Sequence, residues 1–497
     1  MAYPGQTHSL ILLRNGILID GTGRDPYAGE ILISGDRIAS IERQHQVPDA
    51  HVIDCSDQII APGFIDIHSH SDLQVLANDR AKTNQGVTTE VVGNCGFSPY
   101  PFRDRTALHN FANGILCGEG AWGWERARDY LDDVQRRATL VNVLSLVGHG
   151  TLRVAANNDI DRMEGFLHEC LSDGSAGLST GLMYAPGSSA PREELVKLLR
   201  VVARYGKTHA THMRSYSHDL LESIEEQLDL ARESCCRLQI SHLQTVGRGN
   251  WDKQDRALEM IEEARHKGID VEFDSYPYLA GSTVLTQLLP QQALENGLSA
   301  LLALLKNHEE RKRIEDETVK AMAQQWSDIF ISSVGSQQDR SLIGKTIHEV
   351  AQERGQSGIG AALDLLIEEN AQVNILSFNQ SETNLRKLLS HPLCSIISDG
   401  FYVKGRPHPR LYGTFPCLLG EIVREKRWLN LAQAIHKVTD KPARRFDMTH
   451  RGRLQAGYAA DLVVFDPQRI AARATYEDPA IGPVGITAVF RNGKQIT

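Results

Sequence analysis

The stretch that decides the fold is Pro62-Gly63-Phe64-Ile65-Asp66-Ile67-His68-Ser69-His70-Ser71-Asp72. It begins at a turn-forming Pro-Gly pair, continues as a short apolar run and ends in two histidines spaced two residues apart. Side chains at i and i+2 of a β-strand point to the same face, so we expect His68 and His70 to project together from the carboxyl end of a buried strand. Two imidazoles in that position can form half of a metal site. A pair of solvated loop histidines is the alternative.

Composition and charge narrow the class of protein. The chain has 497 residues, of which 41% are hydrophobic and 23% are charged, as in ordinary globular proteins. This length allows one large barrel-type domain plus a smaller one, or several modest domains. The formal net charge is −9 and no dense basic stripe occurs, so a nucleic-acid partner is not expected.

Targeting signals and cysteine usage favour a cytoplasmic protein. No apolar run approaches the length of a membrane span, and Met1 to Gln6 lacks the basic segment and apolar core of a signal peptide. The eight cysteines are scattered and form no Cys-x-x-Cys pair. This pattern is typical of reduced thiols rather than of a disulfide framework.

Both ends of the chain are rich in predicted strands. Residues 9–60 contain short apolar runs separated by turn residues, and the runs 30–34 and 37–41 flank Gly35-Asp36 as in a β-hairpin. Residues 461–466 and 486–490 repeat the pattern near the C-terminus. We therefore predict one small β domain made from residues 1–60 and 451–497, with a long domain, residues 61–450, inserted between its two parts.

The middle of the chain alternates strands and helices. Candidate helices include Arg192–Arg204, Leu220–Glu233 and Arg256–His266, and the eight candidate strands are Phe64–His68, Thr89–Val92, Leu140–Val147, Gly177–Ser179, His209–His212, Leu238–His242, Val271–Asp274 and Ser395–Ser398. Eight strand–helix units predict an α/β fold of the (β/α)8 TIM-barrel type. A doubly wound open sheet is the alternative, but it places its ligand at a single switch point, whereas polar residues here follow many different strands.

One connection is too long for a simple barrel. Between the seventh and eighth predicted strands, Ser282 to Ser390 includes helical, charge-rich sequence such as Leu301–Glu317. We predict an inserted subdomain at about residues 283–344, which either overhangs the barrel mouth or is a purely structural elaboration.

Metal-competent side chains recur at the ends of the predicted strands. They are His68 and His70 after the first strand, Cys95 after the second, His212 at the fifth, His242 at the sixth and Asp399 at the eighth. A TIM barrel brings its strand ends onto one face, where active sites form. Each residue alone is a weak signal, but together they predict a metal centre.

The same residues carry a resemblance to a known family. His-x-His on the first strand, His on the fifth and sixth and Asp on the eighth resemble the amidohydrolase superfamily. The segments Gly93-Asn94-Cys95-Gly96, Gly148-His149-Gly150-Thr151-Leu152-Arg153, Ser241-His242-Leu243, His408-Pro409-Arg410 and Gly413-Thr414-Phe415-Pro416 are similar to those of the D-aminoacylase, or N-acyl-D-amino-acid deacylase, family. The likeness runs over nearly the whole chain.

The resemblance implies a zinc site. Many superfamily members bridge two metals with a carboxylated lysine on the fourth strand, but no lysine lies in Gly174–Gly187. Cys95 then supplies the anionic ligand, since a thiolate is a softer zinc ligand than a carboxylate. The family implies one tight zinc at Cys95, His212 and His242. A second position, bounded by His68, His70 and Asp399, is expected to be weakly occupied or empty.

The resemblance also implies how a small-molecule substrate is bound. In this family a D-amino-acid carboxylate is held by Arg, Tyr, Ser and Lys. The first three match Arg410, Tyr276 and Ser282, and an arginine fork suits a carboxylate. The lysine should follow the sixth-strand histidine by two residues, where this chain has Gln244. This departure removes one positive charge from the expected carboxylate pocket.

The leading hypothesis is a zinc-dependent hydrolase of N-acyl-D-amino acids. Zinc would polarise the acyl carbonyl and activate water, and Asp399 would take the proton of the water and return it to the leaving nitrogen. A second hypothesis, favoured by Gln244, is an amidohydrolase acting on a cyclic amide, a urea-like compound or an acylated amine. A third is a non-catalytic zinc-binding barrel protein, against which Asp399 argues.

Overall fold

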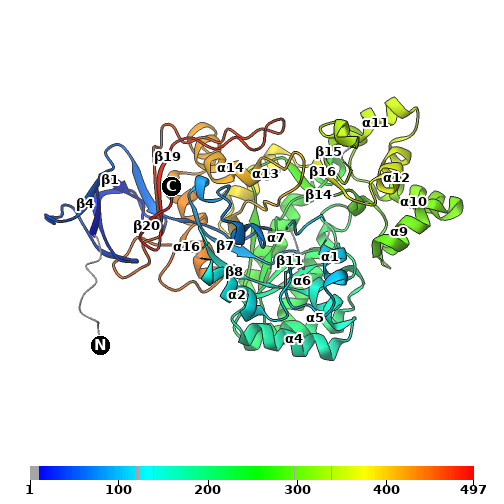
Figure 1. The fold of residues 1–497 in the computed structure, drawn as a ribbon, viewed down its shortest axis with the longest axis horizontal. Coiled ribbons are helices and arrows are strands. Elements are labelled where there is room, and N and C mark those ends of the chain that lie inside the picture. The colour runs from blue at the N-terminus through cyan, green and yellow to red at the C-terminus, as the bar shows by residue number, and fades with distance from the viewer. Residues whose placement is uncertain (1–9, 113, 119–121, 138, 296, 337) are drawn as a thin grey trace.

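Strands from both chain ends form one sheet. The computed structural model describes residues 10–497 except 113, 119–121, 138, 296 and 337. In the described chain this sheet has eight strands: β1 (Leu10–Leu18), β2 (Tyr27–Ser34), β3 (Arg37–Glu42), β4 (His51–Asp54), β5 (Ile59–Pro62), β18 (Leu462–Phe465), β19 (Ile486–Arg491) and β20 (Lys494–Gln495). Strand β18 pairs antiparallel with β5 and so joins the two chain ends, while β2 and β3 form the predicted hairpin. The sheet lies at one end of the molecule (Figure 1).

The middle of the chain folds as parallel strands. One sheet contains β6 (Phe64–Asp66), β7 (Val87–Val92) and β8 (Asn142–Ser145), and the next contains β9 (Val147–Gly148), β10 (Gly177–Gly181), β11 (Thr208–His212), β12 (Arg237–Ile240), β13 (Val271–Ser275) and β17 (Cys394–Ile396). Strands β8 and β9 flank Leu146 on one continuous segment. Beyond β17, Gly400 bridges to Ser69 in parallel, and the Asp399 N–H donates to the His68 carbonyl at 2.9 Å. The protein is thus a mixed α/β structure with parallel sheets, and each of the eight predicted strand positions carries a strand.

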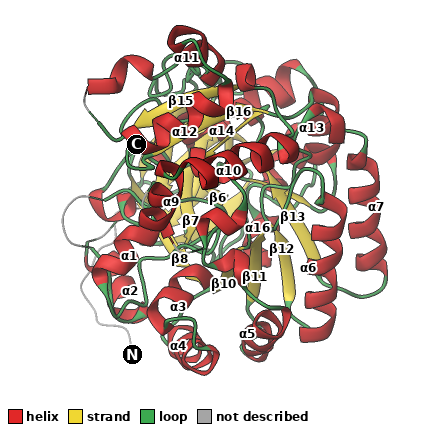
Figure 2. Cartoon of the chain, turned by 90° about the vertical axis from the view of Figure 1, so that its right-hand side faces the viewer, coloured by secondary structure: helices red, strands yellow, loops and turns green. Residues whose placement is uncertain are grey.

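Burial on both faces explains the sequence of these strands. Every residue of β7, β10 and β11 is buried, as expected for parallel strands covered by helices. The helices outside the insertion are α1 (Arg105–Ala112), α2 (Ala127–Arg136), α3 (His149–Ala156), α4 (Ile160–Ser172), α5 (Arg192–Arg204), α6 (Leu220–Ser234), α7 (Lys253–His266), α13 (Glu382–Ser390), α14 (Arg410–Cys417), α15 (Leu431–Lys437) and α16 (Asp440–Arg445). Helices α4 to α7 lie along the outside of strands β10 to β13 (Figure 2). The predicted helix at Arg192–Arg204 is confirmed, and α7 begins three residues before the predicted Arg256.

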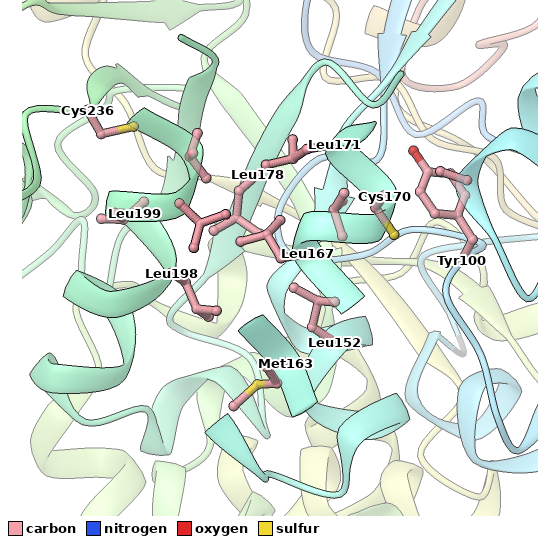
Figure 3. Close-up of a cluster of buried hydrophobic side chains, with 14 of the residues drawn as sticks. Tyr100, Leu152, Met163, Leu167, Cys170, Leu171, Leu178, Leu198, Leu199 and Cys236 are labelled. Atoms are coloured by element: carbon pink, nitrogen blue, oxygen red, sulfur yellow. The ribbon is translucent and has the colours of Figure 1, made fainter. Parts of the chain in front are cut away.

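Leucine side chains hold these helices on the sheet. Leu167 and Leu171 of α4 and Leu198 and Leu199 of α5 pack with Leu178 of β10 in one buried cluster (Figure 3). Burying one such side chain contributes roughly 1.5–3 kcal/mol, so this layer fixes where the carboxyl end of β10 lies. Among the described helices, none has both the length and the hydropathy needed to cross a bilayer.

The insertion is larger than the segment expected at about 283–344. Strands β14 (Ala280–Val284), β16 (Val373–Phe378) and β15 (Ile329–Val334) form an antiparallel sheet in that spatial order. Its helices are α8 (Gln291–Leu294), α9 (Gly297–Lys306), α10 (His308–Ala321), α11 (Ile347–Arg354) and α12 (Gly358–Glu368). Because β16 lies between β14 and β15, the unit extends to Phe378 and has its own apolar core. Helices α9 to α12 lie at the end of the molecule opposite β1 (Figure 1).

A buried charge cluster lies where β6, β7 and the segment after β17 meet. Lys82 is 2% exposed, and its Nζ donates to Asp66 Oδ2 at 2.6 Å and lies 3.6 Å from Glu90 Oε2. Burial alone would lower the pKa of Lys82, but the charges of Asp66 and Glu90 raise it above its usual value. The backbone N–H of Ser398 donates to Asp66 Oδ1 at 3.0 Å. The ammonium group therefore balances two carboxylates and ties the first strand to the last.

We predict that Lys82→Met destabilises the protein strongly. The change leaves Asp66 and Glu90 buried without a counter-charge, and breaking a buried pair in this way costs about 3–5 kcal/mol. The urea concentration at the unfolding midpoint should fall accordingly. Lys312→Met is the matched control, because Lys312 forms an exposed pair with Asp316 on α10, and exposed pairs contribute little to stability. Equal midpoints for the two variants would contradict the structural role of Lys82.

Candidate metal centre and substrate cavity

The six side chains predicted to bind metal lie together at the carboxyl ends of the parallel strands. His68 and His70 follow β6, Cys95 follows β7, His212 ends β11, His242 follows β12 and Asp399 follows β17. All six are at least nine-tenths buried. Their donor atoms form three groups in which the atoms lie within 4.8 Å of one another: His68, His70 and Cys95; Cys95, His212 and His242; and His68, His242 and Asp399.

Cys95 lies between the two predicted metal positions. Its Sγ is 3.3 Å from His68 Nε2 and 3.5 Å from His242 Nε2. Asp399 Oδ1 is 3.4 Å from His68 Nε2 and 3.5 Å from His70 Nε2. The sequence assigned Cys95 to the tight position alone, whereas in the structure its sulfur is within reach of both histidine groups. The thiol is therefore placed to serve either position or to bridge them.

Three of these residues have an unusual backbone. Cys95, His242 and Asp399 have φ values of +54°, +33° and +47°, in the left-handed region that residues with a Cβ rarely adopt. Such conformations persist only where surrounding contacts enforce them, and they concentrate at functional sites. Each places its side chain at the sharp turn directly after a strand.

The turn around Cys95 needs the glycines that flank it. Gly93 and Gly96 have φ values of +78° and +82°, and a Cβ on Gly93 would collide with the Leu146 carbonyl. Ser179 of β10 holds this turn from the side. Its hydroxyl donates to the Gly93 carbonyl and accepts from the Gly96 N–H at 3.0 Å. The fourth strand thus supports the cysteine in a protein that lacks a lysine on that strand.

The charges around the site lower the pKa values of Cys95 and Asp399 and so favour their anionic forms. Burial alone would raise the pKa of the Cys95 thiol, but the charge of His68 and the neighbouring imidazoles of His212 and His242 hold it well below its usual value. Burial would likewise raise the pKa of Asp399, but the charge of Arg410, followed by that of His68, holds it well below its usual value. Burial lowers the pKa of His212, which keeps its imidazole neutral. A thiolate, a carboxylate and a neutral imidazole are the forms that bind metal.

Asp274 orients two of the histidines. This side chain at the end of β13 is 1% exposed. Its Oδ1 lies 3.5 Å from His68 Nδ1 and accepts from the His242 backbone N–H at 2.6 Å, while Oδ2 accepts from Gln239 Nε2 at 2.7 Å. A carboxylate on the far nitrogen of a histidine fixes which ring nitrogen faces a metal. The sequence contained this signal, because Asp274 ends a predicted strand, but it was not included in the predicted site.

The donor set fits zinc. Within the described residues, both ring nitrogens of His212 are buried without a hydrogen-bond partner, an arrangement that is costly unless something else binds there. Thiolate, imidazole and carboxylate are the side chains that bind zinc in proteins. Cys95, His212 and His242 provide three of them from three different strands.

The four predicted substrate residues line one cavity with these side chains. The cavity has a volume of about 480 Å³, and its walls include Gln244, Tyr276, Ser282 and Arg410. Arg410 is 1% exposed, and its Nη2 lies 2.9 Å from Asp399 Oδ2. Its guanidinium carbon lies 4.6 Å from the centre of the Tyr276 ring, and the Tyr276 hydroxyl donates to Gln244 Oε1 at 3.1 Å.

His408 explains why the His-Pro-Arg segment positions Arg410. Its Nδ1 accepts from the Arg410 backbone N–H at 3.0 Å, and its Nε2 lies 3.0 Å from the Ala280 carbonyl as donor. Burial holds the pKa of His408 well below its usual value, so the ring is neutral and can both accept and donate. The start of α14 is thus fixed against the first strand of the insertion.

Other residues of the cavity were not predicted. Tyr184 and Arg214 follow β10 and β11, where a strand-end signal existed. Ser377 and Asn379 come from β16 and the turn after it. No local signal placed them near the metal centre, because their position depends on how the insertion packs over the strand ends.

Comparisons with known proteins agree with this geometry. The profile of the amidohydrolase family matches residues 51–497. A D-aminoacylase from Alcaligenes xylosoxydans xylosoxydans is 34% identical to this chain, over 98% of this chain and 94% of its own length.

Two solved structures have similar folds. That of N-acyl-D-glutamate deacylase from Bordetella bronchiseptica, complexed with zinc and a phosphonate mimic of the tetrahedral intermediate, aligns with a TM-score of 0.84 and 32% identity over 99% of this chain and 96% of its own. A structure of D-aminoacylase, whose binuclear metal centre is activated by one metal and attenuated by a second, aligns with a TM-score of 0.84 and 31% identity over 98% and 96%. The chain therefore belongs to the amidohydrolase family and, within it, to the D-aminoacylase group.

Proposed function

We propose that this protein is a zinc-dependent hydrolase that cleaves N-acyl-D-amino acids into a carboxylate and a free D-amino acid. One observation carries the proposal: a single cavity contains Cys95, His212 and His242, which can hold zinc, and the buried pair of Asp399 with Arg410. Its relatives act on this class of substrate and one was solved with zinc. A tight zinc at the thiolate group and a weaker position near His68, His70 and Asp399 remain the proposed arrangement.

Each residue of the site has a separate role in the proposed hydrolysis. Bound zinc would polarise the acyl carbonyl and acidify water. Asp399 is ionised and accepts a proton from the attacking water as the oxygen bonds to the acyl carbon. The C–N bond then breaks, and Asp399 returns the proton to the leaving nitrogen. Arg410, with Tyr276 and Ser282 beside it, holds the carboxylate of the amino acid in place.

A second candidate is an amidohydrolase of cyclic amides, urea-like compounds or acylated amines. The observation that favours it is Gln244, whose Oε1 accepts from Tyr276 and from Gln380 Nε2, each at 3.1 Å, and which adds no positive charge where the family has a lysine. A hydrolysis screen over paired D and L N-acyl amino acids and cyclic amides separates the two candidates. Turnover of cyclic amides alone would favour the second one.

We also propose the architecture that goes with this activity. The eight strand positions from β6 to β17 would close as a (β/α)8 barrel, supported by the contacts of Asp399 and Gly400 with the segment after β6. Residues 61–450 would form this domain, with the small β domain made of 1–60 and 451–497. A cytoplasmic location stays a prediction from the cysteine usage.

We predict that Cys95→Ala removes the tight zinc and the activity. The change takes away the thiolate that His212 and His242 need as their partner, and an incomplete ligand set binds zinc far more weakly. Metal analysis after dialysis and a turnover assay on the same preparation test this. Cys235→Ala is the matched control, because Cys235 is exposed on the surface after α6. Full zinc and full turnover in Cys95→Ala would exclude Cys95 as a ligand.

We predict that Asp399→Asn keeps the zinc but loses turnover. The variant leaves Cys95, His212 and His242 intact, yet an amide cannot accept the proton from water, so kcat should fall about 10²–10⁴-fold. Asp255→Asn, at an exposed ion pair with Lys387, provides the control. A variant with normal zinc and near-normal kcat would overturn the role of Asp399 as the base, and a loss of zinc with full turnover upon reloading would make it only a ligand.

We predict that Arg410→Lys raises KM for N-acyl-D-amino acids. Lysine keeps the charge but cannot form the planar two-point contact with a carboxylate, so KM should rise about tenfold or more. The corresponding amino-acid amides lack the carboxylate, and their KM should change much less. Equal effects on acids and amides would mean that Arg410 does not bind the carboxylate.

A further inference from the structure

The inserted sheet presents one face to the substrate cavity. Gly281 of β14 pairs with Ser377 of β16, and side chains two residues apart share a face, which places Asn379 beyond Ser377 on the same side. Gly281, Thr283, Ser377 and Asn379 all line the cavity, as does Gln287 from the turn after β14. Ile375, two residues before Ser377, adds one apolar side chain to this wall. The other side chains named here are hydroxyls and carboxamides, and none of them carries a charge.

The polar atoms of this wall lack protein partners. Ser377 and Asn379 are only 5% and 7% exposed, yet Ser377 Oγ and Asn379 Oδ1 have no hydrogen-bond partner within the described residues. The same holds for Gln287 Oε1. Buried polar atoms are paired in nearly all native proteins, since leaving one unpaired costs about 1–3 kcal/mol. The partners of this wall must come from the contents of the cavity.

Charge in the cavity argues against an acidic group at this wall. Among the described residues, the cavity is lined by one arginine besides Arg410, which is Arg214. Its Nε donates to Glu226 at 2.9 Å, and its two terminal nitrogens donate to the Ser188 and Ala190 carbonyls at 2.7 and 3.0 Å. Each of the three nitrogens of Arg214 thus has a protein partner, and its charge is paired with Glu226. Asp219 and Glu317 also line the cavity, and they add negative charge.

The wall adjoins Tyr276, one of the residues proposed to bind the amino acid. A Cβ on Gly281 would lie 3.3 Å from the Tyr276 hydroxyl and 3.4 Å from Asn379 Nδ2, so these two groups face the same spot. Tyr276 lies beside Arg410. Gln380, the next residue, donates to Gln244 and continues the row of carboxamides. An amino acid held at Arg410 would direct its side chain toward this wall.

We propose that Ser377 and Asn379 form a subsite for an uncharged, hydrogen-bonding side chain of the D-amino acid, such as a carboxamide. The inference rests on the proposed deacylase function and names its substrate class. A carboxamide offers both N–H donors and a carbonyl acceptor, so it can pair with the hydroxyl and the amide of the wall at once. A hydrocarbon side chain would leave these atoms unpaired, and a site built to hydrogen-bond a group discriminates against analogues that lack it.

Three substrates of nearly equal shape test the subsite. The zinc-loaded protein is assayed with N-acetyl-D-glutamine, N-acetyl-D-methionine and N-acetyl-D-glutamate, and kcat/KM is compared. We expect the glutamine derivative to exceed the other two at least tenfold. Asn379→Leu and Ser377→Ala should each reduce the ratio of glutamine to methionine at least fivefold. Ser333→Ala, a buried serine of β15 outside the cavity lining, should leave the ratio unchanged.

The outcomes separate this inference from the proposed function. Hydrolysis of other N-acyl-D-amino acids but of none of these three would overturn the subsite alone, whereas no hydrolysis of any N-acyl-D-amino acid would overturn both. Hydrolysis with no preference for glutamine over methionine, or with a ratio that neither variant alters, would overturn the subsite alone and assign the unpaired atoms to water. Zinc content and circular dichroism show whether each variant folds. If one variant fails to fold, the other still tests the subsite.

Discussion

The burial of two anions constrains this structure more than any other feature. The pKa values of Cys95 and Asp399 are both held well below their usual values in a buried site, where an unpaired charge is very costly. Imidazole rings surround both side chains, and Nη2 of Arg410 lies 2.9 Å from Asp399 Oδ2. These partners come from strands far apart in sequence. The parallel arrangement of the strands is what allows them to meet, since every carboxyl end faces the same edge.

Holding such a cluster in place requires support from residues that touch no substrate. Cys95, His242 and Asp399 adopt left-handed backbone conformations, and each is held by a neighbouring strand. Ser179 hydrogen-bonds the turn of Cys95, and Asp274 accepts from the backbone N–H of His242. The buried pair of Lys82 and Asp66 stabilises the place where β6 meets the segment after β17, next to Asp399. The turns that carry the metal-binding side chains are therefore held in place by residues of the neighbouring strands.

The sequence was most informative where local pattern and topology agree. The alternation of apolar strands and helices predicted every strand position. The metal-competent residues named after five of these strands lie at one edge, His68, Cys95 and Asp399 among them. The sequence was least informative for the insertion, predicted at about 283–344. Its central strand, β16, lies nearly a hundred residues after β14, and no local pattern reveals that pairing. The roles of Asn379 and Gln380 could not be predicted for the same reason.

In the proposed mechanism, the pair of Arg410 and Asp399 links substrate recognition to catalysis. In the free protein the charge of Arg410 is the largest influence that lowers the pKa of Asp399, which leaves a carboxylate that is a weak base. A substrate carboxylate that pairs with Arg410 neutralises part of this charge, so the pKa of Asp399 rises toward the working pH when the correct substrate binds. Binding of the substrate carboxylate then strengthens the base that takes the proton from the attacking water. An amide substrate without that carboxylate meets the same metal centre with a weaker base, so Arg410 can select substrates through kcat as well as through KM.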